Sequence, residues 1–273
     1  MPGRLGLIAG GGELPRRLVQ ACIASGRPCF VVALDGFAER DVADGVPHAW
    51  VRLGAVGEAI RLLHEAGVEE LCFAGKVRRP SLLELRPDAR AAAFFAKVGL
   101  RALGDDGLMK AVVAGFEAEG FRVVGPDVVL AALLASEGPL GSIGPDATAQ
   151  ADIARGVAVV RALGALDVGQ AAVVQQGMVL AVEAIEHTDA LLARSGSLRR
   201  EGPGGVLVKC AKPGQERRAD LPTIGPNTVT LAHAAGLRGI AIEAGATLIV
   251  DRQAVAAEAD RLGLFVIAVP VPP

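Results

Sequence analysis

Short apolar runs, each followed by a glycine or a helical repeat, set the pattern of the first half of the chain. Three of these runs have the length and composition of buried strands: Leu5–Ala9, Cys29–Leu34 and Glu70–Ala74. Apolar residues recur at helical spacing after residue 12, across 56–66 and over 88–120, and residues 121–124 form another strand-like run. Buried strands that alternate with helices are typical of a parallel sheet covered by helices. The pattern predicts a Rossmann-like parallel-sheet domain.

The second half has more strands than helices. Helical periodicity covers residues 150–163, 229–235 and 253–262. The runs Ala171–Gln175 and Met178–Glu183 flank Gln176-Gly177 and predict a hairpin. Further strands are predicted at Val206–Lys209, Ile240–Glu243, Thr247–Val250 and Phe265–Val269. This pattern indicates a mixed α/β domain that does not repeat the first.

A glycine- and proline-rich stretch separates the two patterns. Residues 138–147 include three glycines and two prolines, a composition typical of a linker. We therefore expect an N-terminal domain over 1–137, a linker over 138–148 and a C-terminal domain over 149–273. The predicted class is α/β.

Composition narrows the classes of function. The 273 residues are 51% hydrophobic with a net charge of −2, so no overall positive field favours nucleic acid. No apolar run reaches the ~20 residues that span a bilayer, and the chain opens on a strand pattern instead of a signal peptide. The four cysteines lack the spacing of a zinc site or a disulfide framework. We expect a soluble, cytosolic protein.

Two glycine turns follow predicted strands and favour anion binding. Gly10-Gly11-Gly12 lies between a strand and a helix, where backbone N–H groups and the helix dipole attract an anion. It is neither a Walker loop nor a complete dinucleotide fingerprint, and a tight turn alone would also explain it. Gly75-Lys76 follows the third strand, at the edge where open α/β sheets bind ligands.

Clustered charges suggest a site for phosphate and metal. Asp105-Asp106 stands at a predicted helix start, where one acid could cap the helix or both could hold Mg²⁺ with substrate phosphates. Glu183 to Asp189 contains more acids than a helix cap requires. The run 209–218 carries cations and is followed by Asp220 before Pro222. A phosphate site and a solvated loop both fit that run.

These segments, in order and in register from Leu5 to about Val269, resemble one family. The matching motifs are Leu7-Ile8-Ala9-Gly10-Gly11-Gly12-Glu13-Leu14-Pro15, Phe73-Ala74-Gly75-Lys76-Val77, Gly104-Asp105-Asp106, Val179-Leu180-Ala181-Val182-Glu183 with Thr188-Asp189, and Lys209 through Lys212-Pro213 to Asp220-Leu221-Pro222-Thr223-Ile224-Gly225. They are similar to the LpxI-type UDP-2,3-diacylglucosamine pyrophosphatases. One departure is His187, which stands where the family pattern leads us to expect glycine.

The resemblance implies two α/β domains and Mg²⁺-dependent hydrolysis of UDP-2,3-diacylglucosamine to UMP and 2,3-diacylglucosamine 1-phosphate (lipid X), in lipid A synthesis. It implies attack by water at the phosphorus next to the sugar, with Asp220 catalytic. Together with the paired carboxylates noted above, this predicts Asp105, Asp106 and Asp220 as metal ligands. The implied substrate-binding residues are Gly11, Gly12, Gly75, Lys76, Gln176, Glu183, Thr188, Asp189, Lys209, Lys212 and Thr223.

The substrate's two acyl chains lead us to expect peripheral association with the cytoplasmic face of the inner membrane, and a homodimer stays open. Two other classes of protein also stay open. A nucleotide-sugar-binding oxidoreductase would use Gly10–Gly12 for a dinucleotide and Asp35 for its ribose. A non-catalytic nucleotide-binding regulator would need no acids at 105 and 220.

Overall fold

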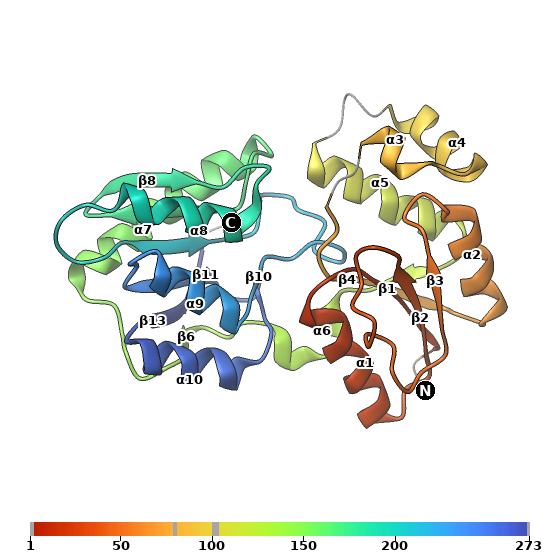
Figure 1. Ribbon diagram of the computed structural model, residues 1–273, viewed down its shortest axis with the longest axis horizontal. Coiled ribbons are helices and arrows are strands. Elements are labelled where there is room, and N and C mark those ends of the chain that lie inside the picture. The colour runs from red at the N-terminus through yellow and green to blue at the C-terminus, as the bar shows by residue number, and fades with distance from the viewer. Residues whose placement is uncertain (1–2, 79–80, 100–103, 272–273) are drawn as a thin grey trace. The chain divides into compact units, whose positions relative to one another are not determined.

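The computed structural model describes residues 3–78, 81–99 and 104–271, and the chain divides into two compact units (Figure 1). Unit 1 comprises Met1–Ala131 together with Glu216–Asp220. Unit 2 comprises Ala132–Gln215 and Leu221–Pro273. A five-residue segment from the second half of the sequence therefore belongs to the first unit, which the hydrophobic pattern did not predict.

Unit 1 is built on a five-stranded parallel sheet with the order β3-β2-β1-β4-β5. Its strands are β1 (Leu5–Ala9), β2 (Cys29–Leu34), β3 (His48–Val51), β4 (Glu70–Ala74) and β5 (Arg122–Val123). Its helices are α1 (Glu13–Ser25), α2 (Val56–Glu65), α3 (Leu82–Leu85), α4 (Ala89–Val98), α5 (Asp105–Ala118) and α6 (Pro126–Val129). The predicted Rossmann-like domain is confirmed.

Helices bury both faces of this sheet. Val31 and Val32 are neighbours on β2 that point to opposite faces, and both are 0% exposed. One face packs against α2 and α5 through Ile60, Leu63 and Phe116. Because both faces are covered, the strands are nearly continuous apolar runs, which is why they are recognisable in the sequence.

Unit 2 contains a six-stranded mixed sheet with the order β6-β13-β11-β9-β7-β8. Its strands are β6 (Gly138–Pro139), β7 (Ala171–Gln175), β8 (Met178–Val182), β9 (Val206–Lys209), β11 (Gly239–Glu243) and β13 (Phe265–Val269). Three of them, β9, β11 and β13, run parallel, whereas β6, β7 and β8 join through antiparallel pairs. The predicted hairpin and the mixed character are confirmed.

A second, two-stranded sheet and four helices complete unit 2. The small sheet pairs β10 (Thr223–Ile224) with β12 (Leu248–Ile249) in parallel. The helices are α7 (Ala147–Ala165), α8 (His187–Ser195), α9 (Pro226–Ala234) and α10 (Arg252–Leu262), with 3₁₀ turns at Ala131–Leu133 and Gly196–Leu198. Residues of α7 pack on one face of the large sheet, and residues of α8, α9 and α10 pack on the other.

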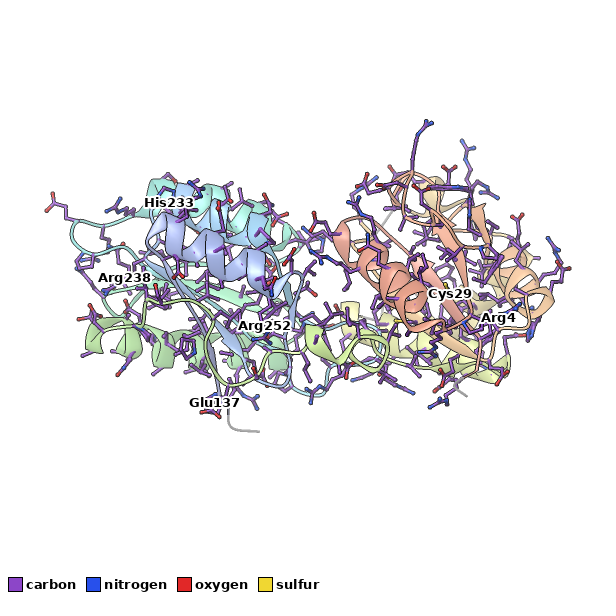
Figure 2. All side chains as sticks on the ribbon, turned by 90° about the horizontal axis from the view of Figure 1, so that it is seen from below. Arg4, Cys29, Glu137, His233, Arg238 and Arg252 are labelled. Carbon is purple, nitrogen blue, oxygen red and sulfur yellow. The ribbon has the colours of Figure 1, made fainter. Side chains whose placement is uncertain are left out.

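The expected linker over 138–148 is instead an integral part of unit 2, and the division falls near residue 131. Gly138 and Pro139 form β6, which pairs with β13. Arg252 donates to the carbonyl oxygen of Leu134 at 3.0 Å, and Arg238 pairs with Asp146 (Figure 2 labels both arginines). Glycine and proline here serve an edge strand and its turns, so their abundance does not mark a linker.

Two other differences concern unit 1. The strand β3 was missed because it is a sheet edge, where His48 is exposed and the apolar run is short. The helical region predicted over 88–120 is two helices, α4 and α5, and residues 100–103 lie outside the described part. Among the described residues, no helix combines the length and apolar character needed to cross a membrane.

His187 adopts a left-handed backbone conformation with φ of 64° at the first residue of α8. This conformation costs an L-residue roughly 1–2 kcal/mol, whereas glycine adopts it readily. The family pattern, which leads us to expect glycine here, therefore agrees with the backbone geometry. His187 is exposed, so replacing it removes little packing.

We predict that His187→Gly raises the free energy of unfolding of unit 2 by about 0.5 kcal/mol, the released strain less the backbone entropy of glycine. Urea denaturation monitored by circular dichroism measures this. Ala190→Gly is the matched control, because Ala190 is an exposed residue of the same helix with helical geometry. It should lower stability by about 1 kcal/mol. A destabilised His187→Gly variant would show that the histidine side chain stabilises the turn.

Candidate functional site

The strand order of unit 1 creates a switch point between β1 and β4. The chain runs from β1 to β2 on one side, and β4 lies on the other side of β1. The turns after β1 and β4, Gly10–Gly12 and Gly75-Lys76, therefore meet at the carboxyl edge of the sheet. Open α/β sheets bind ligands at such a point.

These two turns are hydrogen-bonded to each other. Gly11 N donates to Lys76 O at 2.9 Å, and Lys76 N donates to Gly11 O at 2.8 Å. Gly75 has φ of 96°, and a Cβ there would lie 2.7 Å from the carbonyl oxygen of Gly11. Only glycine fits at position 75, so its role is to allow this close approach of two backbones.

The N–H of Gly11 is occupied by this pairing, so the groups left for an anion belong to the first turn of α1. Gly12 caps α1 and has no side chain with which to occupy the N–H groups of that turn. The positive end of the helix dipole lies at the same place. The sequence prediction of an anion-binding turn thus fits the geometry, with Gly12 and α1 supplying the donors.

In unit 2, three buried polar side chains form a continuous chain of hydrogen bonds. Lys209 Nζ donates to Thr188 Oγ1 at 2.7 Å, and Thr188 Oγ1 donates to Glu183 Oε1 at 2.7 Å. The three residues are 6%, 7% and 4% exposed, respectively. The buried ammonium group and the buried carboxylate are therefore linked through one hydroxyl group. This arrangement gives each charge a hydrogen-bond partner, which a buried charge needs.

Other expected residues lie at the same edge of the large sheet. Glu183 Oε2 accepts from Gln170 N at 3.2 Å, immediately before β7. Lys212, which follows β9, pairs with Asp167 at 2.7 Å. Asp189 lies in the first turn of α8, next to Thr188. The structure thus brings together five predicted residues: Glu183, Thr188, Asp189, Lys209 and Lys212.

Gln176 lies away from this group. It forms the hairpin turn at the far end of β7, where its N–H and that of Gly177 donate to Asp152 at 3.0 and 2.7 Å. The register pairs Ala171 with Lys209, so the length of β7, about 17 Å, separates Gln176 from Lys209. Gln176 is part of the Gln176-Gly177 turn. A sequence pattern does not show whether a glutamine at such a position forms only the turn or also binds a ligand.

Thr223 belongs to the small sheet of unit 2 and not to the edge that carries Lys209. It lies on β10, which pairs with β12, and its Oγ1 donates to the carbonyl oxygen of Leu221 at 3.0 Å. Its position directly after Asp220 and Pro222 in sequence is the feature that made it a candidate.

Asp106 and Asp220 both belong to unit 1, and both carboxylate oxygens of Asp106 have protein partners. Its Oδ1 accepts from Glu216 N at 2.8 Å, and its Oδ2 pairs with Lys110 at 2.6 Å. Asp105 is the first residue of α5, and its side chain lies outside the described part. The described residues contain no group of three or more metal-ligating side chains. The assignment of Asp105, Asp106 and Asp220 as metal ligands stays a prediction.

The segment that carries Asp220 is held by side chains that the motif comparison missed. Arg218 bonds Glu216 through Nε and Nη2, each at 2.8 Å, and reaches Glu117 through Nη1 at 2.7 Å. The Arg218 guanidinium holds the pKa of Glu216 below its usual range, so Glu216 is ionised at neutral pH. The charged residues of 216–218 were visible in the sequence, but the sequence did not show that Arg218 pairs with Glu117 on α5.

Cys210 follows Lys209 and provides no nucleophile. Burial raises the pKa of its thiol to about 12, which keeps it protonated at neutral pH.

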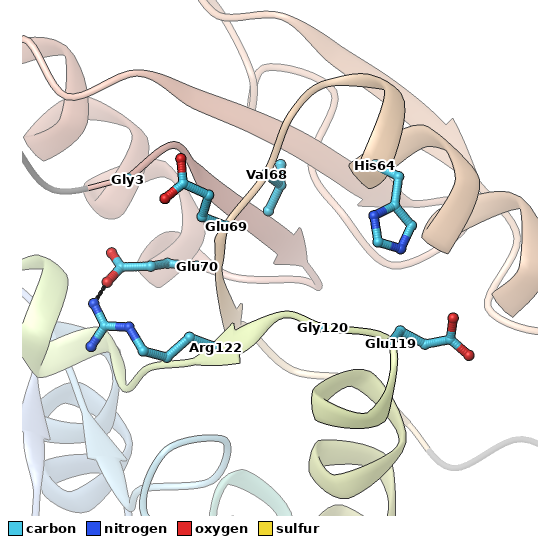
Figure 3. A pocket seen from close by; sticks show the side chains of 8 residues that line it. All are labelled: Gly3, His64, Val68, Glu69, Glu70, Glu119, Gly120 and Arg122. Carbon is cyan, nitrogen blue, oxygen red and sulfur yellow. Dashed lines mark ion pairs between the residues drawn. The ribbon is translucent and has the colours of Figure 1, made fainter.

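A pocket of unit 1 lies at the opposite, amino edge of the five-stranded sheet (Figure 3). Within it, Glu70 pairs with Arg122, and Glu70 also pairs with Arg27. The lining residues are Gly3, His64, Val68, Glu69, Glu70, Glu119, Gly120 and Arg122. The length of β4 separates this pocket from Gly75-Lys76, so it does not belong to the candidate site.

Comparisons with known proteins cover nearly the whole chain. The model of the LpxI N-terminal domain matches residues 4–133, and that of the LpxI C-terminal domain matches residues 136–267. A curated relative from Caulobacter vibrioides, the UDP-2,3-diacylglucosamine pyrophosphatase LpxI, is 46% identical over 273 residues, covering 97% of each chain. With two family domains matched in order and identity at this level, the chain belongs to the LpxI family.

Proposed function

We propose that this protein hydrolyses the diphosphate of UDP-2,3-diacylglucosamine, giving UMP and 2,3-diacylglucosamine 1-phosphate for lipid A synthesis. The observation that carries the proposal is the 46% identity, over 97% of both chains, to a relative named for that activity. Nothing in the comparisons favours the oxidoreductase or the regulator.

The chain's own residues support recognition of a diphosphate. In unit 1, the first turn of α1 after Gly12 offers backbone donors beside Lys76. In unit 2, Lys209 and Lys212 supply cations at the edge that also holds Glu183. Lys209 already has a hydroxyl partner and Lys212 an acidic one, which fixes the position of each ammonium group before a phosphate arrives.

Asp220 is the residue we propose for the reaction itself. Its carboxylate would hold Mg²⁺ together with oxygens of the diphosphate, since Mg²⁺ is commonly bound by one or two carboxylates and substrate phosphates. The metal would supply charge neutralisation of the diphosphate. Water adds to the phosphorus next to the sugar, the bond from that phosphorus to the bridging oxygen breaks, and UMP leaves with that oxygen.

We also propose that the protein works in the cytoplasm, at the cytoplasmic face of the inner membrane, since a two-chain lipid resides in a bilayer. Exposed apolar side chains flank the polar edge of unit 2. Ile185, which follows β8, is 89% exposed, and Leu166 and Val168, which precede β7, are also exposed. Such residues can contact acyl chains or the membrane surface. A homodimer stays a prediction.

Removal of divalent metal should abolish turnover. If Mg²⁺ neutralises the diphosphate, excess EDTA stops UMP release, and added Mg²⁺ or Mn²⁺ restores it. Release of UMP from UDP-2,3-diacylglucosamine is measured by chromatography. Undiminished hydrolysis in EDTA, with bound metal excluded by elemental analysis, would contradict the metal mechanism.

Asp220→Ala should lower kcat by at least ~10²-fold, the lower range for a positioned electrostatic group, while the substrate still binds. Asp44→Ala is the matched control, because Asp44 is an exposed aspartate of the same unit, outside the site. Its kcat should equal that of the wild type. Near-normal turnover of Asp220→Ala would make Asp220 structural and move the catalytic assignment to Asp105 and Asp106.

Membrane association should be partial and reversible. Flotation with vesicles of anionic phospholipid should carry part of the protein, and salt or mild detergent should release it. Complete retention after an alkaline wash would contradict a peripheral attachment.

A further inference from the structure

The segment Glu216–Asp220 is attached to the rest of unit 1 by several charged contacts. Several of its contacts are made with side chains of one helix, α5, and others lie within the segment itself. Asp106 is in the first turn of α5 and Glu117 is in its last turn. The segment is therefore fastened to both ends of the same helix.

The first attachment joins a carboxylate to the backbone. Asp106 Oδ1 accepts from the N–H of Glu216, while Lys110 pairs with Oδ2. A charged acceptor makes this hydrogen bond stronger than one between neutral groups. Asp106 thus fixes the point at which the segment begins.

The second attachment is a bridge of three side chains. Arg218 binds both carboxylate oxygens of Glu216 in a fork and reaches Glu117 with its remaining terminal nitrogen. The side chains of Arg218 and Glu117 are 43% and 40% exposed, so their pair contributes little to the stability of the fold. Its geometric effect is to orient the segment along α5.

Glu216 links both attachments to Asp220 through its backbone carbonyl group. The carbonyl oxygen of Glu216 accepts from Ala219 N at 3.1 Å and from Asp220 N at 2.9 Å. Ala219 packs against the apolar cluster between α2 and α5. A shift of Glu216 would therefore move the backbone of Asp220 directly.

We propose that Asp106, Glu117, Glu216 and Arg218 are positioning residues that hold the backbone of Asp220 in place for catalysis. This inference rests on the proposed role of Asp220. It also gives Asp106 a different task from the metal ligand that the sequence suggested. A displacement of about 1 Å at a reacting group can reduce turnover ~10²-fold, so a weak surface bridge can have a large kinetic effect.

The comparison of Asp106→Asn with Asp106→Ala separates positioning from metal binding. Asparagine keeps an oxygen that accepts from Glu216 N but loses the charge, whereas alanine loses both. If Asp106 positions the segment, the fall in kcat with alanine exceeds that with asparagine by at least about tenfold. Equal losses in the two variants would overturn the positioning role of Asp106.

Hydrogen exchange followed by mass spectrometry supplies a readout that does not depend on activity. In Asp106→Ala and Glu117→Gln, amide exchange in a peptide spanning 213–222 should accelerate at least about tenfold. Glu65→Gln is the control, because Arg61 and Glu65 form an exposed ion pair on α2 of the same unit. It should leave both the exchange of that peptide and kcat unchanged.

The bridge is tested by kcat and KM in Glu117→Gln and Glu117→Asp. We expect kcat to fall with glutamine, to recover in part with aspartate, and KM to stay nearly constant. Unchanged exchange and unchanged kcat in Glu117→Gln would overturn the role of the bridge. Asp220→Ala, assayed in parallel, separates this inference from the proposed function. Accelerated exchange in Asp106→Ala together with normal turnover of Asp220→Ala would support the attachment of the segment to α5 and refute the catalytic role of Asp220.

Discussion

The burial of both faces of each large sheet is the constraint on which the rest of the structure depends. Strands covered on both sides carry apolar side chains along most of their length, as in all six residues of β2 and the first three of β9. Polar groups are therefore displaced to the strand ends. Ala9 is followed by Gly10, Ala74 by Gly75, and the apolar run of β9 ends on Lys209. The same edges carry the starts of helices, so anion-binding donors and fixed cations gather where the apolar strands stop.

The hydrogen-bonded chain in unit 2 shows how a cation can be kept at such an edge. An isolated buried ammonium costs several kcal/mol, which a buried carboxylate offsets only with good geometry. Thr188 provides that geometry, because its one hydroxyl accepts from Lys209 and donates to Glu183. The residue before it, His187, has the left-handed backbone that starts α8 at this place. Backbone strain and a buried polar network thus occur at consecutive positions, as is common at functional sites.

Local sequence patterns predicted most of the fold and part of the site. The runs that became β1, β2, β4, β9 and β13 are apolar because they are covered on both faces, so their pattern is local and visible. The edge strand β3 and the segment 138–148 lack that cover, and their structure depends on partners distant in sequence. Gln176 was grouped with Lys209 because a motif gives order along the chain and not the antiparallel register that separates them.

The placement of 216–220 in unit 1 could not be predicted from the order of residues along the chain. One contiguous family model spans 136–267, yet five residues within that range belong to unit 1. Their attachment depends on Asp106 and Glu117, which are about a hundred positions earlier and carry no local sign of this task. A C-terminal piece cut at the family boundary would contain Asp220 but none of the α5 side chains that orient its segment. The smallest part of the chain able to position Asp220 therefore includes α5. The two family domains occupy separate ranges of the sequence, but the backbone of Asp220 depends on residues from both ranges.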